Sequence, residues 1–115
     1  MAAVDKGHPV YNSIPGRYVS RIGNGTYSID GTVYHTQQND GDNTLHSGTN
    51  NWSYRFWNVS AVAEDSIAFS IVDPSLAEQG MPGEVDAIVT YLLANSTLHI
   101  TMSAKSPDVK TRTCL

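Results

Sequence analysis

The sequence predicts an all-β protein folded as an antiparallel β-sandwich. Two long runs, residues 85–93 and 98–104, carry an apolar side chain at every second position, which is the period of a strand with one buried face. A short Asn95-Ser96 turn joins these two runs, and an Asp30-Gly31 pair joins two earlier β-prone runs. Successive strands that are connected by such short turns run antiparallel, and they favour a sandwich of packed sheets.

The first half of the chain contributes one predicted hairpin. Residues 26–29 and 32–35 are rich in Thr, Tyr, Val and Ile, which are residue types that suit a half-buried strand. The Asp30-Gly31 pair between them suits a tight two-residue turn, because both central residues of such a turn need a positive φ. We therefore expect two short strands joined at this pair.

The second half contributes four predicted strands. Residues 55–63 and 66–72 form the first two, with a turn at Glu64-Asp65 between them. Residues 73–83 follow as a long loop that two prolines and two glycines interrupt, so that residues 75–78 can make one helical turn at most. The two alternating runs that predict the fold class then complete the sheet.

The composition limits the classes of function that this protein can have. A chain of 115 residues with 40% hydrophobic residues is long enough for one domain with a modest core. The net charge of −4 and the lack of a basic run argue against a nucleic-acid partner, and no apolar stretch approaches the length of a membrane span. A single cysteine, Cys114, excludes an internal disulfide and argues against a Cys-His metal cluster, so no metal or cofactor is expected.

Residues 43–58 hold the candidate functional side chains. His46 precedes a Ser-Gly pair, where glycine lets the backbone turn sharply, so its imidazole can present a ring nitrogen to a ligand oxygen. Trp52 and Trp57 add flat apolar faces on which the C–H face of a sugar can lie. On the residues alone, the alternative is a loop that enters a core strand with Trp57 simply buried.

Several motifs along the chain resemble, in order and spacing, those of the aldose 1-epimerase (galactose mutarotase) family. Residues 16–22 read Gly-Arg-Tyr-Val-Ser-Arg-Ile, similar to the family's Gly-Arg-x-x-Asn-Arg-Ile. Residues 43–48 read Asn-Thr-Leu-His-Ser-Gly, similar to its Asn-x-Leu-His-Gly-Gly. Residues 82–85 match its Phe-Pro-Gly-Glu-Val segment, with Met81 in place of the phenylalanine. Between the first two motifs, the segments that fall in the family's order are residues 25–31 and 39–41.

The resemblance implies a fold and a substrate class. The family fold is a large antiparallel β-sandwich, so the region from roughly residue 15 to 106 is expected to form a partial galactose mutarotase-like supersandwich. Family members interconvert the α and β anomers of hexoses such as galactose or glucose. An arginine and a histidine early in the chain position the sugar, and these map onto Arg21 and His46. Ser20 stands where the family has asparagine, and Ser47 stands where it has the first glycine of the histidine motif.

The catalytic residues of the family do not map onto this sequence. The family uses a second histidine as the acid and a glutamate near its C-terminus as the base, and no histidine follows His99 here. We therefore predict no catalytic residue in the isolated chain and expect it to lack appreciable mutarotase activity. The alternatives are a lectin-like carbohydrate-binding protein on the same scaffold and a fragment without sugar function.

The domain organisation predicted from the sequence has three parts. Residues 1–14 form a flexible N-terminal segment, residues 15–106 the mutarotase-like portion, and residues 107–115 an atypical C-terminal tail. A sandwich cut partway leaves an unpaired strand edge and an uncovered apolar face, so we predict a homo-oligomer.

Four Asn-x-Ser/Thr sequons are compatible with secretion, although the N-terminal residues lack the apolar core of a signal peptide, and the localisation stays open. The acceptor residues are Asn24, Asn51, Asn58 and Asn95.

Overall fold

The computed structural model describes residues 11–75 and 80–107 of the chain. These residues form eight strands and two short 3-10 helices, and every pair of neighbouring strands runs antiparallel. The strands are β1 (Arg21–Ile22), β2 (Thr26–Ile29), β3 (Thr32–His35), β4 (Thr44–Leu45), β5 (Asn58–Val62), β6 (Ser66–Asp73), β7 (Val85–Ala94) and β8 (Thr97–Lys105). The helices are η1 (Gly23–Gly25) and η2 (Trp52–Tyr54).

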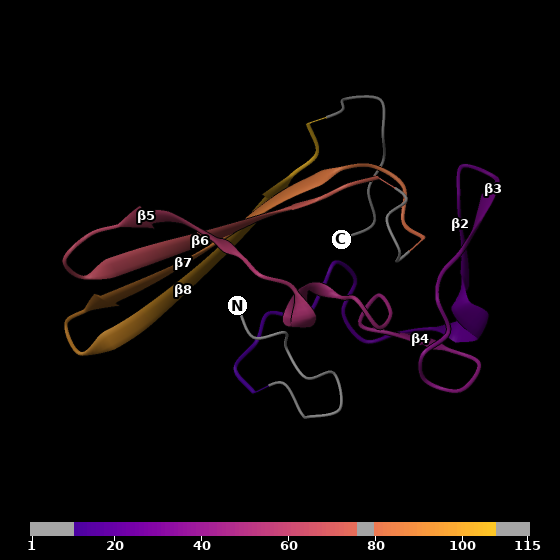
Figure 1. Cartoon of the computed structure of the whole chain (residues 1–115), viewed down its shortest axis with the longest axis horizontal. Helices are drawn as coiled ribbons and strands as arrows, with labels where there is room; N and C mark the ends of the chain where they lie inside the picture. Colours follow the sequence, from indigo (N-terminus) through magenta and orange to yellow (C-terminus); the bar gives the residue numbers. More distant parts are fainter. Residues whose placement is uncertain (1–10, 76–79, 108–115) are drawn as a thin grey trace.

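A four-stranded meander dominates the fold. Strands β5, β6, β7 and β8 lie side by side in chain order and form one twisted sheet. Figure 1 shows the β2–β3 hairpin at the opposite end of the molecule from this sheet, with the segment around β4 and η2 between them. The all-β antiparallel expectation is therefore confirmed.

The two tight hairpins follow from their turn residues. Asp30 and Gly31 have φ values of 49° and 81°, and Asn95 and Ser96 have φ values of 51° and 59°. Two consecutive residues with positive φ form the turn whose twist matches that of the flanking strands. This geometry fixes the pairing of β2 with β3 and of β7 with β8 in the predicted places.

The bounds of β5 and the presence of two short strands differ from the sequence-based prediction. The strand predicted over residues 55–63 is β5, which begins at Asn58, because Arg55 caps η2 and its guanidinium reaches across to the end of β6. Strands β1 and β4 were not predicted, since a ladder of two residues leaves no periodic pattern in a sequence. Of the helical turn predicted at residues 75–78, only Ser75 lies within the described residues.

One end of the sheet's apolar face is covered. Trp52 packs with Ile71, Val85 and Ala87 in a buried cluster, and the partly buried Ile14 and Trp57 lie against it. The two indole rings meet edge to face, with centroids 5.7 Å apart and an interplanar angle of 89°. The residues before β5 thus supply the second layer at this end, and it is aromatic.

The other end of the same face is bare. The large apolar side chains of this region are between 50% and 71% exposed, and they are Val59, Val62, Leu93, Leu98, Ile100 and Met102. All nine residues of β8 are exposed, so the prediction that its alternation marks one buried face is wrong for this strand. Alternation reports which side chains share a face, whereas burial also needs a packing layer, and the described residues place none over β8.

The sequons differ in accessibility. Asn51 is buried, its amide donates to the Gly48 carbonyl, and its side-chain oxygen accepts from the Ser53 N–H. Asn24, Asn58 and Asn95 are exposed. In the described part of the chain, no helix is both long and apolar enough to cross a membrane.

Candidate functional site

The two residues that the sequence assigns to sugar positioning lie side by side on the β1–β4 ladder. Arg21 pairs with Leu45 across this ladder, and the His46 N–H donates to the Ser20 carbonyl at 2.9 Å. Residues 25 positions apart in the chain are therefore neighbours in the fold. The structure places the backbones of Arg21 and His46 next to each other on the β1–β4 ladder. Neither motif alone indicates that the two residues are neighbours.

Polar side chains hold this short ladder in place. The Asn39 side chain brackets Leu45, accepting from its N–H at 2.7 Å and donating to its carbonyl at 3.0 Å. The buried Thr44 hydroxyl contacts the Thr36 hydroxyl at 2.6 Å and donates to the Gln37 carbonyl at 2.8 Å. These bonds replace the long strand pairing that β1 and β4 lack, so the ladder is fixed by side chains rather than by length.

Ser47 ties the histidine turn to the arginine segment. Its hydroxyl accepts from the Tyr18 N–H at 2.7 Å and donates to the Tyr18 carbonyl at 3.1 Å, and the residue is fully buried. A glycine at this position could make neither bond. The serine that departs from the family's motif thus adds two contacts between the segments that carry Arg21 and His46.

The backbone around His46 is strained. Ser20, His46 and Ser47 have φ values of 72°, 51° and 70°, and none of them is glycine. Such conformations cost free energy for L-residues and persist where the surrounding hydrogen bonds over-determine them. Three of them at the junction of two segments indicate that the geometry of this junction is set by something other than local preference.

His46 is oriented by the backbone. Its Nδ1 accepts a hydrogen bond from the Ser20 N–H at 3.1 Å, so in the neutral ring the proton is on Nε2. The residue is half-buried. The imidazole therefore presents an N–H donor, held in one direction, to whatever lies beside the ladder.

Arg21 is oriented by a carboxylate. Its Nε donates to Asp40 Oδ2 at 2.6 Å, and its side chain is 57% exposed. Within the described residues, its two terminal nitrogens donate to no other side chain or carbonyl. Arg21 also lines a hollow of about 390 Å³ together with Tyr18, Ile22 and Tyr27. The guanidinium end is thus available beside a cavity that is large enough for a monosaccharide.

The two tryptophans lie elsewhere. They line a separate hollow of about 320 Å³ on the covered end of the sheet, together with Phe69 and Tyr91. Trp52 is 7% exposed, and its Nε1 donates to Asp73 Oδ2 at 3.0 Å. Trp57 is partly buried, and its Nε1 donates to the Trp52 carbonyl at 3.3 Å. The backbones of Arg21 and His46 are thus neighbours on the β1–β4 ladder, but the side chains of His46, Trp52 and Trp57 do not line the hollow that Arg21 lines.

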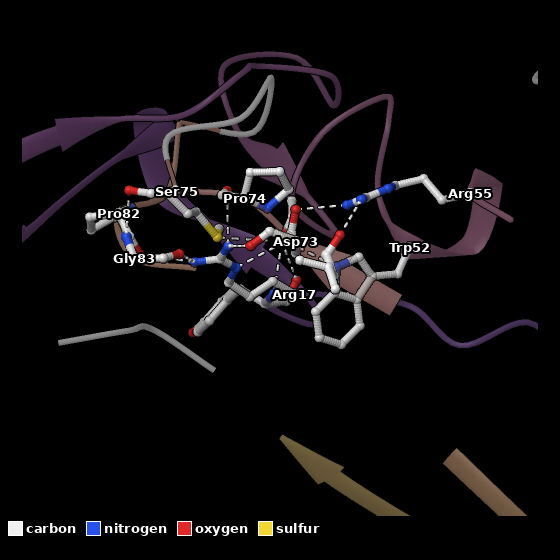
Figure 2. Close-up of polar contacts among 12 residues, drawn as sticks. Arg17, Trp52, Arg55, Asp73, Pro74, Ser75, Pro82 and Gly83 are labelled. Atoms are coloured by element: carbon white, nitrogen blue, oxygen red, sulfur yellow. Dashed lines mark hydrogen bonds and ion pairs between the residues drawn. The ribbon is translucent and has the colours of Figure 1, made fainter. Parts of the chain in front are cut away.

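Sequence reasoning missed a buried ion cluster centred on Asp73. Figure 2 shows Arg17 and Arg55 converging on this carboxylate, with the Trp52 indole beside them. Asp73 Oδ2 accepts from Arg17 Nε at 3.0 Å, and Oδ1 accepts from Arg55 Nη1 at 2.7 Å. Asp73 is 0% exposed. Both partners are arginines of segments that the sequence analysis singled out for other reasons.

The Arg17 guanidinium is fully satisfied. Its remaining donors reach the main-chain oxygens of residues 73, 74, 82 and 83, at 2.7 to 3.4 Å. Together with Nε, all five N–H donors of this arginine are used. Arg17 therefore has no donor left for a ligand, and it clamps the two ends of the 73–83 loop. Its signal in the sequence is its place in the same motif as Arg21.

Of the described histidines, His35 and His99 do not lie with His46. His35 Nδ1 lies 3.3 Å from the Thr26 hydroxyl across the β2–β3 hairpin, and His99 is exposed on β8. Among residues 11–75 and 80–107, no three His, Cys, Asp or Glu side chains form a group that could hold a metal ion. Cys114 lies outside the described residues.

Comparisons with known proteins agree with the motifs. The sequence profile of the aldose 1-epimerase family matches residues 2–114. The galactose mutarotase of Sus scrofa is 35% identical over 99 residues, which cover 86% of this chain and 28% of that protein. A probable aldose 1-epimerase of Arthroderma benhamiae is 37% identical over 91 residues, covering 77% of this chain and 20% of the relative. The chain thus spans about a quarter of the length of these relatives.

Solved structures show the same fold. A GalM/aldose epimerase homologue from C. elegans superposes with a TM-score of 0.74 at 35% identity, over 79% of this chain and 28% of that one. A galactose 1-epimerase from Lactobacillus acidophilus superposes with a TM-score of 0.68 at 24% identity, which bears on the fold alone. The predicted antiparallel β-sandwich class, as part of a mutarotase-like fold, is confirmed. This chain belongs to the aldose 1-epimerase family.

Proposed function

We propose that this chain binds a hexose such as galactose or glucose through Arg21 and His46. The observation that carries the proposal is the fixed pair of donors at the β1–β4 ladder. His46 Nε2–H is oriented by the Ser20 N–H on the other ring nitrogen, and the Arg21 terminal nitrogens are left free by Asp40 on Nε. The names of the curated relatives, galactose mutarotase and aldose 1-epimerase, support the substrate class.

The chemistry of the two groups suits a polyol. A guanidinium holds its donors in a rigid fork, so its two terminal nitrogens can reach neighbouring hydroxyl oxygens of one sugar ring. The His46 Nε2–H can donate to a third oxygen. Because the hollow beside Arg21 is open and leaves much of a ligand in water, the dissociation constant is expected to be on the order of millimolar.

The binding proposal is tested by side-chain NMR during a titration with galactose or glucose. The His46 ring signals are expected to shift and saturate at millimolar sugar, and His46→Ala should abolish the response of the neighbouring amides. His99→Ala is the matched control, because His99 is exposed on β8 and should not affect the response. Titration to high sugar concentration without movement of the His46 signals would contradict the proposal.

The participation of Trp52 and Trp57 stays a prediction. Their indole N–H groups already donate within the protein, to Asp73 and to the Trp52 carbonyl. A sugar at Trp57 would have to stack on the exposed part of the ring. Indole signals followed in the same titration decide whether either tryptophan contacts the sugar.

We further propose that the 115-residue chain does not accelerate mutarotation appreciably. Opening the sugar ring needs a base for the anomeric hydroxyl and an acid for the ring oxygen, each worth roughly 10² to 10⁴-fold in rate. The family's acid histidine and base glutamate have no counterpart in this sequence. Polarimetry on freshly dissolved α-D-galactose separates an enzyme from a lectin-like binder. A rate within about tenfold of what a positioned acid and base provide would overturn this part.

The bare end of the sheet favours a second proposal, that two copies associate through this face. Six large apolar side chains there are at least half exposed, so a second copy can cover them and remove apolar surface from water. Glu64 and Asp65 lie at one end of this surface, where they line a hollow with Val62, Leu93 and Leu98. The edge strand β8 is nine residues long with one charged residue, Lys105, at its end. Such an edge has little of the charge that natural edge strands use to prevent association.

Light scattering at high micromolar concentration tests the association. The expected species is a dimer or larger, and Met102→Lys should shift it to monomer because Met102 points into the bare face. Thr101→Lys is the control, since the adjacent residue points to the opposite face. A wild-type monomer, or equal effects of the two lysines, would refute the proposal.

A further inference from the structure

We propose that Asp40 is a positioning residue that makes the Arg21–His46 site prefer neutral sugars over acidic ones such as hexuronic acids. This inference rests on the proposed hexose binding. It concerns which members of the hexose class the site accepts, and it follows from the way in which the charge of Arg21 is already engaged.

The contact between the two side chains is short and one-sided. Asp40 Oδ2 lies 2.6 Å from Arg21 Nε, so the carboxylate meets the guanidinium at its inner edge. Arginine has one donor at Nε and four on its terminal nitrogens. The ion pair therefore uses the inner donor, turns the plane of the group in one direction, and leaves the outer fork beside the hollow.

Asp40 is itself held in place. Its N–H donates to the Asn43 carbonyl and the Asn43 N–H donates to the Asp40 carbonyl, both at 3.1 Å. The same asparagine accepts from the Asn24 N–H through its side-chain oxygen at 3.2 Å. The carboxylate thus projects from a closed turn rather than from a free loop, and this turn runs directly into β4 and His46.

The site that results has donors but no net positive charge. Arg21 carries one positive charge, Asp40 cancels it, and the His46 ring accepts at Nδ1, as the neutral form does. A second carboxylate, Asp42, lies exposed two residues along the same turn. Hydroxyl groups need only donors and acceptors, whereas a carboxylate or phosphate on the sugar would approach these acidic groups without a free cation.

The consequence is a measurable discrimination. Because Asp40 offsets the charge of Arg21, a carboxylate on the sugar gains little net attraction from this pair while it loses part of its hydration, and the exposed Asp42 adds a weak repulsion. Galacturonate, which carries a carboxylate where galactose has its exocyclic hydroxymethyl group, is therefore expected to bind about fivefold to tenfold more weakly than galactose. In 0.5 M salt the difference should shrink, because screening acts on exposed charges.

Variants of this turn distinguish the specific effect of Asp40 on the affinity ratio from a general effect of negative charge. Asp40→Asn should narrow or reverse the galactose-to-galacturonate affinity ratio, because it frees the Arg21 charge and loosens its orientation. Asp40→Glu keeps the charge and should keep the preference for galactose. Asp42→Asn removes the same charge from a residue that, within the described part of the chain, forms no ion pair with Arg21, and it should change the ratio by less than about twofold. Thermal unfolding of each variant verifies that it is folded.

The affinity ratio is measured by NMR titration of the wild-type chain and the three variants with galactose and with galacturonate. Equal ratios in wild type and Asp40→Asn, or an equal change in Asp42→Asn, would overturn the inference while galactose binding through His46 still stands. If the wild-type chain binds neither sugar, the proposed function itself fails, and the role of Asp40 falls with it.

Discussion

The irregular half of this molecule buries side chains as completely as its regular half does. The segment before β5 contains strands of two to four residues, yet it places Arg17, Thr44 and Ser47 at 4% exposure or less. The β5–β8 sheet has strands of five to ten residues, yet β8 is exposed along its whole length. Backbone regularity and burial are therefore separate properties. Satisfied polar side chains stabilise the irregular half, whereas the sheet has apolar residues that lack a packing layer.

Removing the charge of Asp73 is expected to have the largest effect on stability. Asp73→Asn leaves the buried Arg17 guanidinium without its counter-charge, which typically costs about 3–5 kcal/mol. Urea unfolding of the variant measures the loss. Asp42→Asn removes the same charge from an exposed loop position and should cost less than about 0.5 kcal/mol. A loss below about 1 kcal/mol for Asp73→Asn would show that the cluster does not stabilise the irregular half.

Two identical substitutions on the apolar face of the sheet compare its covered and bare ends. Ile71 is 4% exposed beneath the aromatic layer, and Ile71→Ala should cost about 2–4 kcal/mol of the free energy of unfolding. Ile100 is 50% exposed on the same face, and Ile100→Ala should cost less than about 1 kcal/mol at protein concentrations where the chain is monomeric. Similar losses at both positions in dilute protein would mean that the bare end is covered in solution.

The smallest of the stability effects concerns the contact between a glycine and an indole. A Cβ at Gly16 would overlap the Trp52 ring, whereas a Cβ at Gly23 meets no atom within 4 Å. Gly16→Ala should therefore cost about 1–3 kcal/mol through overpacking, and Gly23→Ala should be close to neutral. Thermal unfolding of the two variants checks this difference. Equal melting temperatures would place Trp52 away from the backbone at residue 16.

Most of the sheet could be predicted from the sequence because the residues that determine its turns and strands are close together in the chain. The Asp30-Gly31 and Asn95-Ser96 pairs determine their turns, and alternation identifies β6, β7 and β8. What could not be predicted is the outcome of non-local pairing. Arg17 donates to Asp73, which lies 56 positions later in the chain, and no periodic pattern in the sequence links two such residues. The resemblance predicted that an apolar face would stay uncovered, but alternation alone predicted a buried face for β8, because a packing layer comes from elsewhere in the chain or from another molecule.

The candidate site was predictable in its residues and not in its geometry. The motifs indicated Arg21 and His46 by resemblance, but they did not indicate that the Ser20 N–H and the Asp40 carboxylate orient these two side chains. For the tryptophans, nearness in the sequence did not correspond to nearness in the fold. Their nearness to His46 in sequence suggested one cleft, yet η2 places Trp52 into the core and its hollow lies apart from that of Arg21.

We propose sugar binding in the irregular half and association through the β5–β8 sheet. Backbone amide NMR shifts of the whole chain test this assignment most directly. Galactose should move the amides of residues 18–22 and 39–48 and leave those of residues 97–105 in place. Dilution from high to low micromolar protein should instead move the amides of residues 97–105 and leave those of residues 18–22 and 39–48 in place, because the bare face is the proposed association surface. Galactose shifts confined to the β5–β8 sheet, or absent altogether at saturating sugar, would contradict the assignment of the sugar site to the irregular half.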